Sequence, residues 1–301
     1  MATFIDTHQH LWDLSLFKLP WTDGGGDLAK DHLMSDYQTA TEQVNVSKTV
    51  YMEVDMHPSQ RMAEANYVTD LCLSENNPMA GAVISGEPSD VDFAQYAAQF
   101  SDNRYIKGIR RILHPPETSP AHCLQSDFVK GIQELGNLNL SFDICVRPSE
   151  LKDAINLVDQ CPDTRFVVDH CGNADPYIVN QQDSGSNGDW REKPYAHERQ
   201  QWMDDMENLG EYPNVICKIS GIIARVRKGW SPDDLAPTVN HCLNAFGPDK
   251  VVFGGDWPVC TVSGATFEQW ASALLQIISM RSEVDQSKFL YENANEFYGL
   301  G

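Results

Sequence analysis

The chain has 301 residues, of which 42% are hydrophobic and 22% charged, so it carries enough apolar material for a large globular core. Its acidic side chains outnumber the basic ones by 43 to 22, and the formal net charge of −21 would repel nucleic-acid phosphates, which argues against a nucleic-acid partner. No apolar run approaches the length of a membrane span and no leader-like segment opens the chain, so we expect a cytoplasmic protein without membrane contact.

The eight cysteines are scattered along the chain, and none forms a Cys-x-x-Cys pair. This spacing excludes zinc knuckles and dithiol redox motifs, and in a protein expected to be cytoplasmic it predicts reduced, mostly buried thiols. Cys171 and Cys260 lie near expected functional segments, but no motif marks either one as a nucleophile. We therefore assign both of them structural roles.

Strand-like and helical segments alternate along the chain. The first strand runs into Ile5-Asp6-Thr7-His8-Gln9-His10, and the long connection that follows contains Trp12, Trp21 and a run of three glycines. Seven further apolar runs predict strands over 49–54, 80–84, 106–113, 142–146, 165–170, 215–220 and 251–256. Helical signals predict helices over 35–44, 59–73, 89–100, 128–135, 149–160, 266–278 and 286–297.

Strands that are nearly continuous in apolar character and alternate with helices are typical of parallel strands covered by helices. Eight such units close into a (β/α)8 TIM barrel, so we predict an α/β fold with a single domain over residues 1–301. The exception to the regular spacing is a polar, glycine-containing stretch around 173–190, after the sixth strand. We interpret it as an insertion on the rim of the active site.

Three of the predicted strands end in side chains that can bind a metal or move a proton. His8 and His10 lie on one side of the first strand, because side chains alternate along an extended chain. His170 ends the sixth strand and Asp256 ends the eighth. The functional groups of TIM barrels lie where strands end, so these four side chains are expected to converge. Each one alone also fits a structural role, but their coincidence at strand ends favours a shared site.

Five short segments, spread from the first strand to the eighth, carry a resemblance to a known family. They are Asp6-Thr7-His8-Gln9-His10-Leu11-Trp12, Lys107-Gly108-Ile109-Arg110, Phe166-Val167-Val168-Asp169-His170-Cys171-Gly172, Cys217-Lys218-Ile219-Ser220-Gly221 and Phe253-Gly254-Gly255-Asp256-Trp257-Pro258-Val259. With these segments in this order the chain resembles the amidohydrolase superfamily, and within it the amidohydrolase-2 branch, which includes sugar-lactone hydrolases. The similarity covers essentially the whole chain.

The resemblance implies that His8, His10, His170 and Asp256 form the polar centre, with Asp256 as the general base. The same four side chains would be the ligands of one divalent metal ion, for which zinc is the first choice, while metal-free catalysis stays open. Binuclear relatives use histidines from both the fifth and the sixth strand, whereas the fifth strand here offers Asp143 and no histidine. This departure indicates one metal ion or none.

Arginines, a lysine and tryptophans complete the expected site. Arg110 and Arg111 are neighbours on one strand, so alternation turns only one of them inward. The resemblance favours Arg110, as a catalytic residue that steadies charge on the lactone oxygen. The candidates for substrate binding are Arg111 and Lys218, as cations, and Trp12 and Trp257, whose rings could pack on a sugar ring. For each of these four, outward pairing or loop packing is an open structural alternative.

We therefore predict a hydrolase that opens a sugar (aldono-) lactone by attack of water at the carbonyl. One alternative is a metal-dependent decarboxylase of an aromatic or unsaturated carboxylic acid, which uses a similar set of histidines and aspartate. A further alternative is a binding protein on a barrel scaffold, which would hold a ligand without turning it over. All three involve a small-molecule ligand, and no feature of the sequence indicates the oligomeric state.

Overall fold

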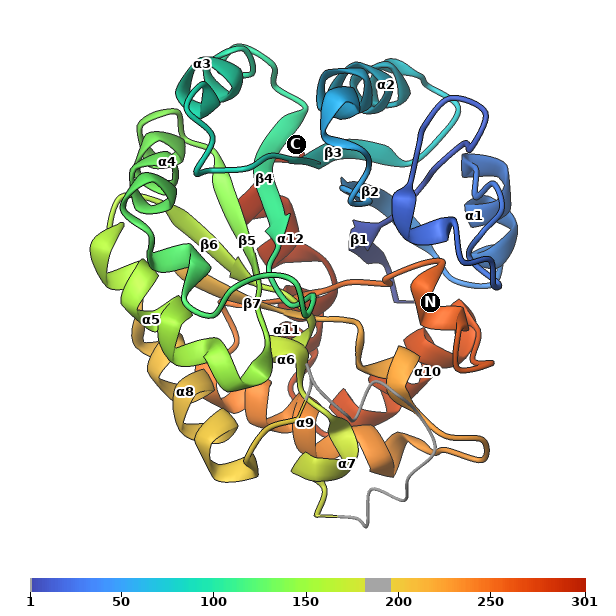
Figure 1. Cartoon of the computed structure of the whole chain (residues 1–301). Helices are drawn as coiled ribbons and strands as arrows, with labels where there is room; N and C mark the ends of the chain where they lie inside the picture. The colour runs from blue at the N-terminus through green and yellow to red at the C-terminus, as the bar shows by residue number, and fades with distance from the viewer. Residues whose placement is uncertain (1, 182–195) are drawn as a thin grey trace.

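Eight parallel strands form one sheet in which each strand pairs with the next along the chain (Figure 1). The computed structural model describes residues 2–181 and 196–301. The strands are β1 (Phe4–Gln9), β2 (Val46–Met52), β3 (Met79–Ser85), β4 (Ile106–Ile112), β5 (Ser141–Cys145), β6 (Arg165–Val168), β7 (Val215–Ile219) and β8 (Val251–Phe253). The ring closes where the Thr7 hydroxyl donates to the Phe253 carbonyl at 2.7 Å and the backbone of Gln9 bridges to Trp257.

Helices surround this ring on the outside and confirm the predicted (β/α)8 TIM barrel (Figure 1). Within the described residues, none of the helices is both long and apolar enough to cross a membrane. The helices are α1 (Met34–Ala40), α2 (Arg61–Leu73), α3 (Phe93–Ala98), α4 (Ser126–Asn137), α5 (Leu151–Gln160), α6 (His170–Asn173), α7 (Pro176–Val179), α8 (Arg199–Glu211), α9 (Pro232–Phe246), α10 (Phe267–Ile278), α11 (Glu283–Ser287) and α12 (Asn293–Tyr298).

Each predicted strand is present, but several end earlier than the sequence pattern suggests, and two of these differences affect the candidate site. β6 ends at Val168 and β8 at Phe253, so His170 and Asp256 lie beyond the strands. Both residues adopt left-handed backbone conformations, with φ of 54° for His170 and 55° for Asp256. A left-handed residue cannot continue a strand, which is the physical reason for the difference.

Some helices also differ from the expectation. The segment predicted as one helix over 286–297 is divided between α11, a π-helical turn at Lys288–Glu292 and α12. α8 and α9 were not identified in the sequence. The first part of the expected insertion forms the short helix α7, with Pro176, Tyr177 and Val179 buried, whereas residues 182–190 lie outside the described residues.

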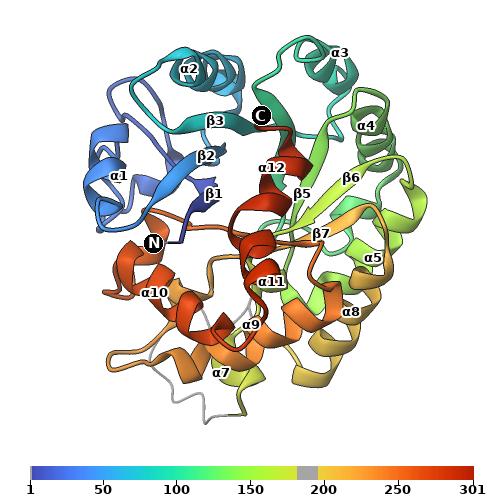
Figure 2. The ribbon, with the colours of Figure 1, turned by 180° about the vertical axis from the view of Figure 1, so that it is seen from behind.

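The C-terminal segment closes one end of the barrel. Tyr298 and Leu300 pack with Ile5, Val50 and Val167, which point into the barrel from the strands. Figure 2 shows α12 over the centre of the ring, on the side where the strands begin. With this end filled, a ligand has access to the barrel interior from the opposite face, at the carboxyl ends of the strands.

A buried carboxyl group joins α2 to the barrel. Glu64 on α2 accepts hydrogen bonds from the Tyr51 hydroxyl at 3.0 Å and from the backbone and hydroxyl of Ser85 at 2.9 and 2.6 Å. Burial, followed by the charge of Glu53, raises the pKa of the Glu64 carboxyl to about 7. The protonated carboxyl is therefore the form that the folded protein favours below that pH.

This pKa predicts a particular dependence of stability on pH. Between about pH 4.5 and 7 the unfolded chain releases the Glu64 proton while the folded protein keeps it, so the free energy of unfolding falls as the pH rises, by about 2–3 kcal/mol. Glu64→Gln cannot ionise and should flatten this part of the curve. Urea denaturation of both proteins across this pH range measures the difference, and parallel curves would contradict the assignment.

Candidate active site

His8, His10 and Asp256 meet at the carboxyl ends of β1 and β8. The Nε2 atom of His10 lies 3.3 Å from Oδ1 of Asp256, and the Nε2 atom of His8 lies 3.7 Å from the same oxygen. His170 joins them from the end of β6, with its ring centroid 4.5 Å from that of His8. The four side chains named from the strand ends therefore converge at one point of the barrel.

The hydrogen bonds of His10 leave its Nε2 atom facing a carboxylate oxygen of Asp256. Its Nδ1 atom lies 3.0 Å from the Met52 carbonyl oxygen, which can only accept, so Nδ1 carries the proton. In the neutral ring Nε2 then presents a lone pair to the Asp256 carboxylate. Two acceptors at this distance repel unless a proton or a cation lies between them. The arrangement is thus suited to a shared proton or a bound metal ion.

Asp6 ties the ends of β1 and β8 together. Its Oδ1 atom accepts the backbone N–H groups of His8 at 3.0 Å and of Gly255 at 2.6 Å, while Oδ2 accepts the Tyr37 hydroxyl at 2.9 Å. A Cβ atom on Gly255 would lie 2.2 Å from the Phe267 ring, so only glycine fits there. This cross-link fixes where Asp256, the next residue, stands relative to the histidines.

A second close approach positions His170. Its Nδ1 atom lies 2.9 Å from the Ser220 hydroxyl at the end of β7. The following residue, Gly221, has φ of 70°, and a Cβ atom there would come within 2.4 Å of the same nitrogen. Glycine therefore allows β7 to pack against the imidazole, and Ser220 sets the orientation of the ring.

Beneath the histidines lies a chain of five buried charged side chains, which we call the charge layer: Glu53, Arg110, Asp169, Lys218 and Asp143. Arg110 donates to Glu53 at 2.7 Å and to Asp169 at 3.1 Å. Lys218 reaches Asp169 at 2.9 Å and Asp143 at 2.6 Å. The charges alternate in sign along the chain, so each one faces an opposite charge. Buried ions need such partners, because their desolvation is otherwise strongly unfavourable.

The charge layer also determines the orientation of His8. An N–H of Arg110 lies 3.2 Å from Nε2 of His8 and can only donate, so this nitrogen accepts and Nδ1 carries the proton. Nδ1 lies 3.6 Å from Oδ1 of Asp169. Burial lowers the pKa of His8 well below its usual value and that of His170 to about 4, so both rings are neutral at pH 7. Burial alone would raise the pKa of Asp169, but the charge of Lys218 holds it well below its usual value.

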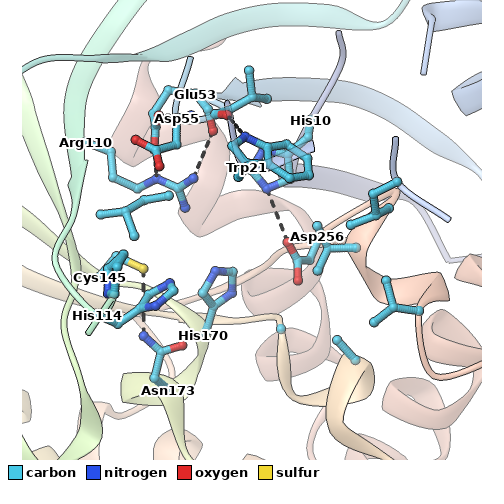
Figure 3. Close-up of a pocket in the computed structure, with 18 of the residues that line it drawn as sticks. His10, Trp21, Glu53, Asp55, Arg110, His114, Cys145, His170, Asn173 and Asp256 are labelled. Carbon is cyan, nitrogen blue, oxygen red and sulfur yellow. Dashed lines mark hydrogen bonds and ion pairs between the residues drawn. The ribbon is translucent and has the colours of Figure 1, made fainter. Parts of the chain in front are cut away.

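The cluster opens into a cavity of about 530 Å³ (Figure 3). In the view of Figure 3 Arg110 lies on the left, Asp256 on the right and His170 below them, and His10 and Glu53 also line the cavity. The rest of the wall combines apolar and polar side chains. Among these lining residues are Trp12, Trp21, Leu28, Val54, Asp55, Ile112, His114, Glu117, Asn173, Ala224, Arg225, Val259 and Val262.

The four residues predicted to bind substrate occupy different places. Trp12 lines the cavity, with its indole nitrogen donating to the Lys30 carbonyl at 2.6 Å. Trp257 is not among the residues that line this cavity and packs edge-on against Tyr37. Lys218 lies in the charge layer below the cavity and is fully buried. Arg111 points away from the barrel axis, as alternation with Arg110 requires, and pairs with Glu87 at 2.7 Å.

Several residues of the site carried no assigned role in the sequence. Glu53 interrupts an apolar strand segment, and that interruption is the signal that could have marked it. Asp169 precedes His170, yet its contacts with Arg110 and Lys218 come from strands that are distant in sequence. Asn173 accepts from Arg225 at 2.7 Å and donates to the Val146 carbonyl at 2.8 Å, which joins two walls of the cavity. Only the fold brings these partners together.

Comparison with known proteins gives the family. The family model described as "Amidohydrolase" matches residues 5–300. The chain belongs to the amidohydrolase family. Membership in a family of enzymes confirms the prediction that it is an enzyme, and small molecules are the substrates of its enzyme relatives.

The relatives of this amidohydrolase include enzymes named for different reactions. An L-fucono-1,5-lactonase from Burkholderia multivorans is 25% identical over 91% of this chain and 90% of its own. A crystal structure of an amidohydrolase from Burkholderia multivorans with bound zinc has a TM-score of 0.83 at 22% identity, with both chains covered completely. A 2,6-dihydroxybenzoate decarboxylase from Rhizobium has a TM-score of 0.62 at 12% identity over 99% of this chain and 98% of its own. The two structural matches show the shared fold.

The side chains of this amidohydrolase form two overlapping groups that fit a divalent metal ion. Ligand atoms of His8, His10 and Asp256 lie within 4.8 Å of one another, and so do those of His8, Asp169 and His170. Imidazole nitrogens and carboxylate oxygens are usual zinc ligands. The facing acceptors of His10 and Asp256 are the feature that such an ion would resolve.

The charge layer predicts that Lys218 is essential for the stability of this amidohydrolase. Lys218→Met would leave Asp143 and Asp169 buried without their shared cation and should lower the free energy of unfolding by about 3–5 kcal/mol. Arg111→Ala removes a partly exposed pair and should lower it by about 1 kcal/mol or less. Chemical denaturation of both variants provides the comparison. Equal losses would mean that the layer contributes no more than a surface ion pair.

Proposed function

We propose that the enzyme opens an aldonolactone by attack of water at the lactone carbonyl. Family membership and the similarity to a protein named L-fucono-1,5-lactonase support this reaction. The observation that carries the proposal is the Asp256 carboxylate, placed 3.3 Å from His10 at the cavity wall. A carboxylate beside imidazoles at a cavity wall is suited to take a proton from water beside a carbonyl carbon.

Each side chain of the site has a defined part in this reaction. Asp256 accepts the proton of the attacking water and returns it to the alkoxide that leaves when the ring opens. His10 and His170, both on the cavity wall, hold the water and the carbonyl in position. Arg110 lines the same cavity and stabilises the negative charge that develops on the carbonyl oxygen. Its own partners, Glu53 and Asp169, keep the guanidinium in place.

His8, His10, His170 and Asp256 would hold a divalent ion, for which zinc is the first choice. When bound, the ion would acidify a water molecule or polarise the carbonyl group. Arg110 can only donate to Nε2 of His8, so the charge layer keeps this ring in the tautomer whose Nε2 carries no proton. The orientation of this imidazole is therefore set by the protein itself.

The cavity favours a neutral, hydroxyl-rich substrate. Carboxylates of Glu53, Asp55, Glu117 and Asp256 line it, and they can accept hydrogen bonds from sugar hydroxyls. The charge of Arg110 is balanced within the charge layer. An acid substrate would meet these carboxylates as like charges, which gives the decarboxylase alternative less support than the lactonase. Trp12 and Trp21 add indole surface on which the carbon face of a sugar ring can pack.

The proposed base can be tested by Asp256→Asn. The amide cannot accept the proton, so kcat should fall by about 10²- to 10⁴-fold. The melting temperature should change little, because the side chains have nearly the same shape. Asp127→Asn, on the exposed surface of α4, removes the same charge far from the cavity and should keep full activity. Near-normal turnover by Asp256→Asn would rule out its role as the base.

The substrate preference can be tested with a panel of lactones in a pH-indicator assay, because ring opening releases a proton at neutral pH. Neutral aldonolactones should be hydrolysed with kcat/KM at least about tenfold above that for lactones with additional carboxylates, since a like-charge contact of about 1.4 kcal/mol is enough for that ratio. A preference for the charged lactones would contradict this account of the cavity. Carbon dioxide release without water consumption would identify the decarboxylase instead.

A further inference from the structure

A group of basic side chains lies at the opposite end of the barrel, where the strands begin. Arg104, Lys107 and Arg165 line one cavity of about 450 Å³, together with Phe297, Tyr298 and Gly299 where α12 ends. A neighbouring cavity of about 540 Å³ shares Arg104 and Lys107 and adds Lys48. In a chain with a formal net charge of −21, this is a local concentration of positive charge.

The contacts of these cations differ from those elsewhere in the protein. Arg61, Arg147 and Lys288 each pair with a carboxylate at 2.9 Å or less. Arg104, by contrast, donates to the Tyr105 hydroxyl at 2.6 Å and lies over the same ring. Its neighbour Lys107 donates to the Gly299 carbonyl at 3.1 Å.

Arg165 completes the cavity wall and likewise uses uncharged partners. It donates to the carbonyls of Phe297 at 2.5 Å and Asn139 at 2.9 Å. Among residues 2–181 and 196–301, no carboxylate forms an ion pair with Arg104, Lys107 or Arg165. The three positive charges are therefore not balanced at close range by the described part of the chain.

The cations are close enough to affect each other. Burial lowers the pKa of Lys107, and the charges of Arg104 and Arg165 lower it further. The only carboxylate side chain among the residues lining their cavity is Glu296, which is exposed to solvent. Like charges that are held together in a polar hollow are stabilised by an anion that binds between them.

We propose that this cavity binds a phosphate-type oxyanion between Arg104, Lys107 and Arg165. Arginine presents its N–H groups in a planar fork that matches two oxygens of such an anion, and lysine adds a point charge. The site lies at the start of the strands, whereas the candidate active site lies at their carboxyl ends. Anion binding here is therefore independent of lactone hydrolysis.

The basic side chains also have a structural role. Arg104 allows anion binding to be tested separately from that role. Lys107 and Arg165 hold carbonyl groups of the C-terminal segment, so their replacement could loosen the end of the barrel. Arg104 is exposed and makes its hydrogen bond to the adjacent residue. Replacing Arg104 removes one charge of the proposed site and leaves those carbonyl contacts in place.

The test is a titration of the full chain with inorganic phosphate, followed by calorimetry and by the melting temperature, at an ionic strength held constant with chloride. The wild-type protein should show saturable binding and a rising melting temperature. Arg104→Ala should bind at least about tenfold more weakly, since a charge-assisted pair of bonds is lost. Lys130→Ala removes an exposed cation on α4 and should bind like the wild type.

Two results would overturn the proposal. The first is the lack of saturable binding by the wild-type protein. The second is unchanged affinity in Arg104→Ala, because phosphate would then bind elsewhere, for example in the active-site cavity. Should the alanine variant melt at a lower temperature than the wild type without phosphate, Arg104→Gln keeps the length of the side chain and repeats the test. A parallel titration with glycerol phosphate shows whether the site prefers a phosphate ester or free phosphate. If either anion binds at this site, its affinity must fall in Arg104→Ala.

Discussion

The compensation of buried charge inside the barrel is the constraint on which the site depends. The charge layer places five ionisable side chains at and below the cavity wall, and a charged one without its partners would be strongly unfavourable in the interior. The alternation of sign offsets that penalty and fixes Arg110 and Asp169 in space. These two residues orient His8, and His8 in turn lies against Asp256 and His170. The geometry of the candidate catalytic groups thus follows from the packing of charges beneath them.

The fold could be predicted from the sequence because strands buried on both faces leave nearly continuous apolar runs. All eight runs proved to be strands of the barrel. The helix α8 was missed because its sequence is mostly polar, and Trp202, Met206 and Leu209 are the only large apolar side chains on its buried side. The helix α9 contains Pro237, which is a poor signal for a helix interior. Its capping box, from Ser231 to Asp234, was the stronger sign.

The candidate site could be predicted in part. His8, His10, His170 and Asp256 stand at strand ends in recognisable segments, and the structure brings them together. The partners in the charge layer lie far apart in the sequence, so no local pattern connects them. Trp12 lines the cavity and Trp257 does not, and the sequence could not distinguish them. The course of each loop decides whether an indole reaches the cavity or packs against other rings. Such contacts are properties of the assembled barrel.

The central claim is that water attacks the carbonyl carbon of a lactone in this cavity. The most direct measurement is hydrolysis, in ¹⁸O-labelled water, of the aldonolactone that is turned over fastest, with the position of the label determined by mass spectrometry after one turnover. One labelled oxygen is expected in the new carboxylate, because the proposed role of Asp256 is to direct water to the carbonyl. Label in the released hydroxyl, or a product without label, would contradict it.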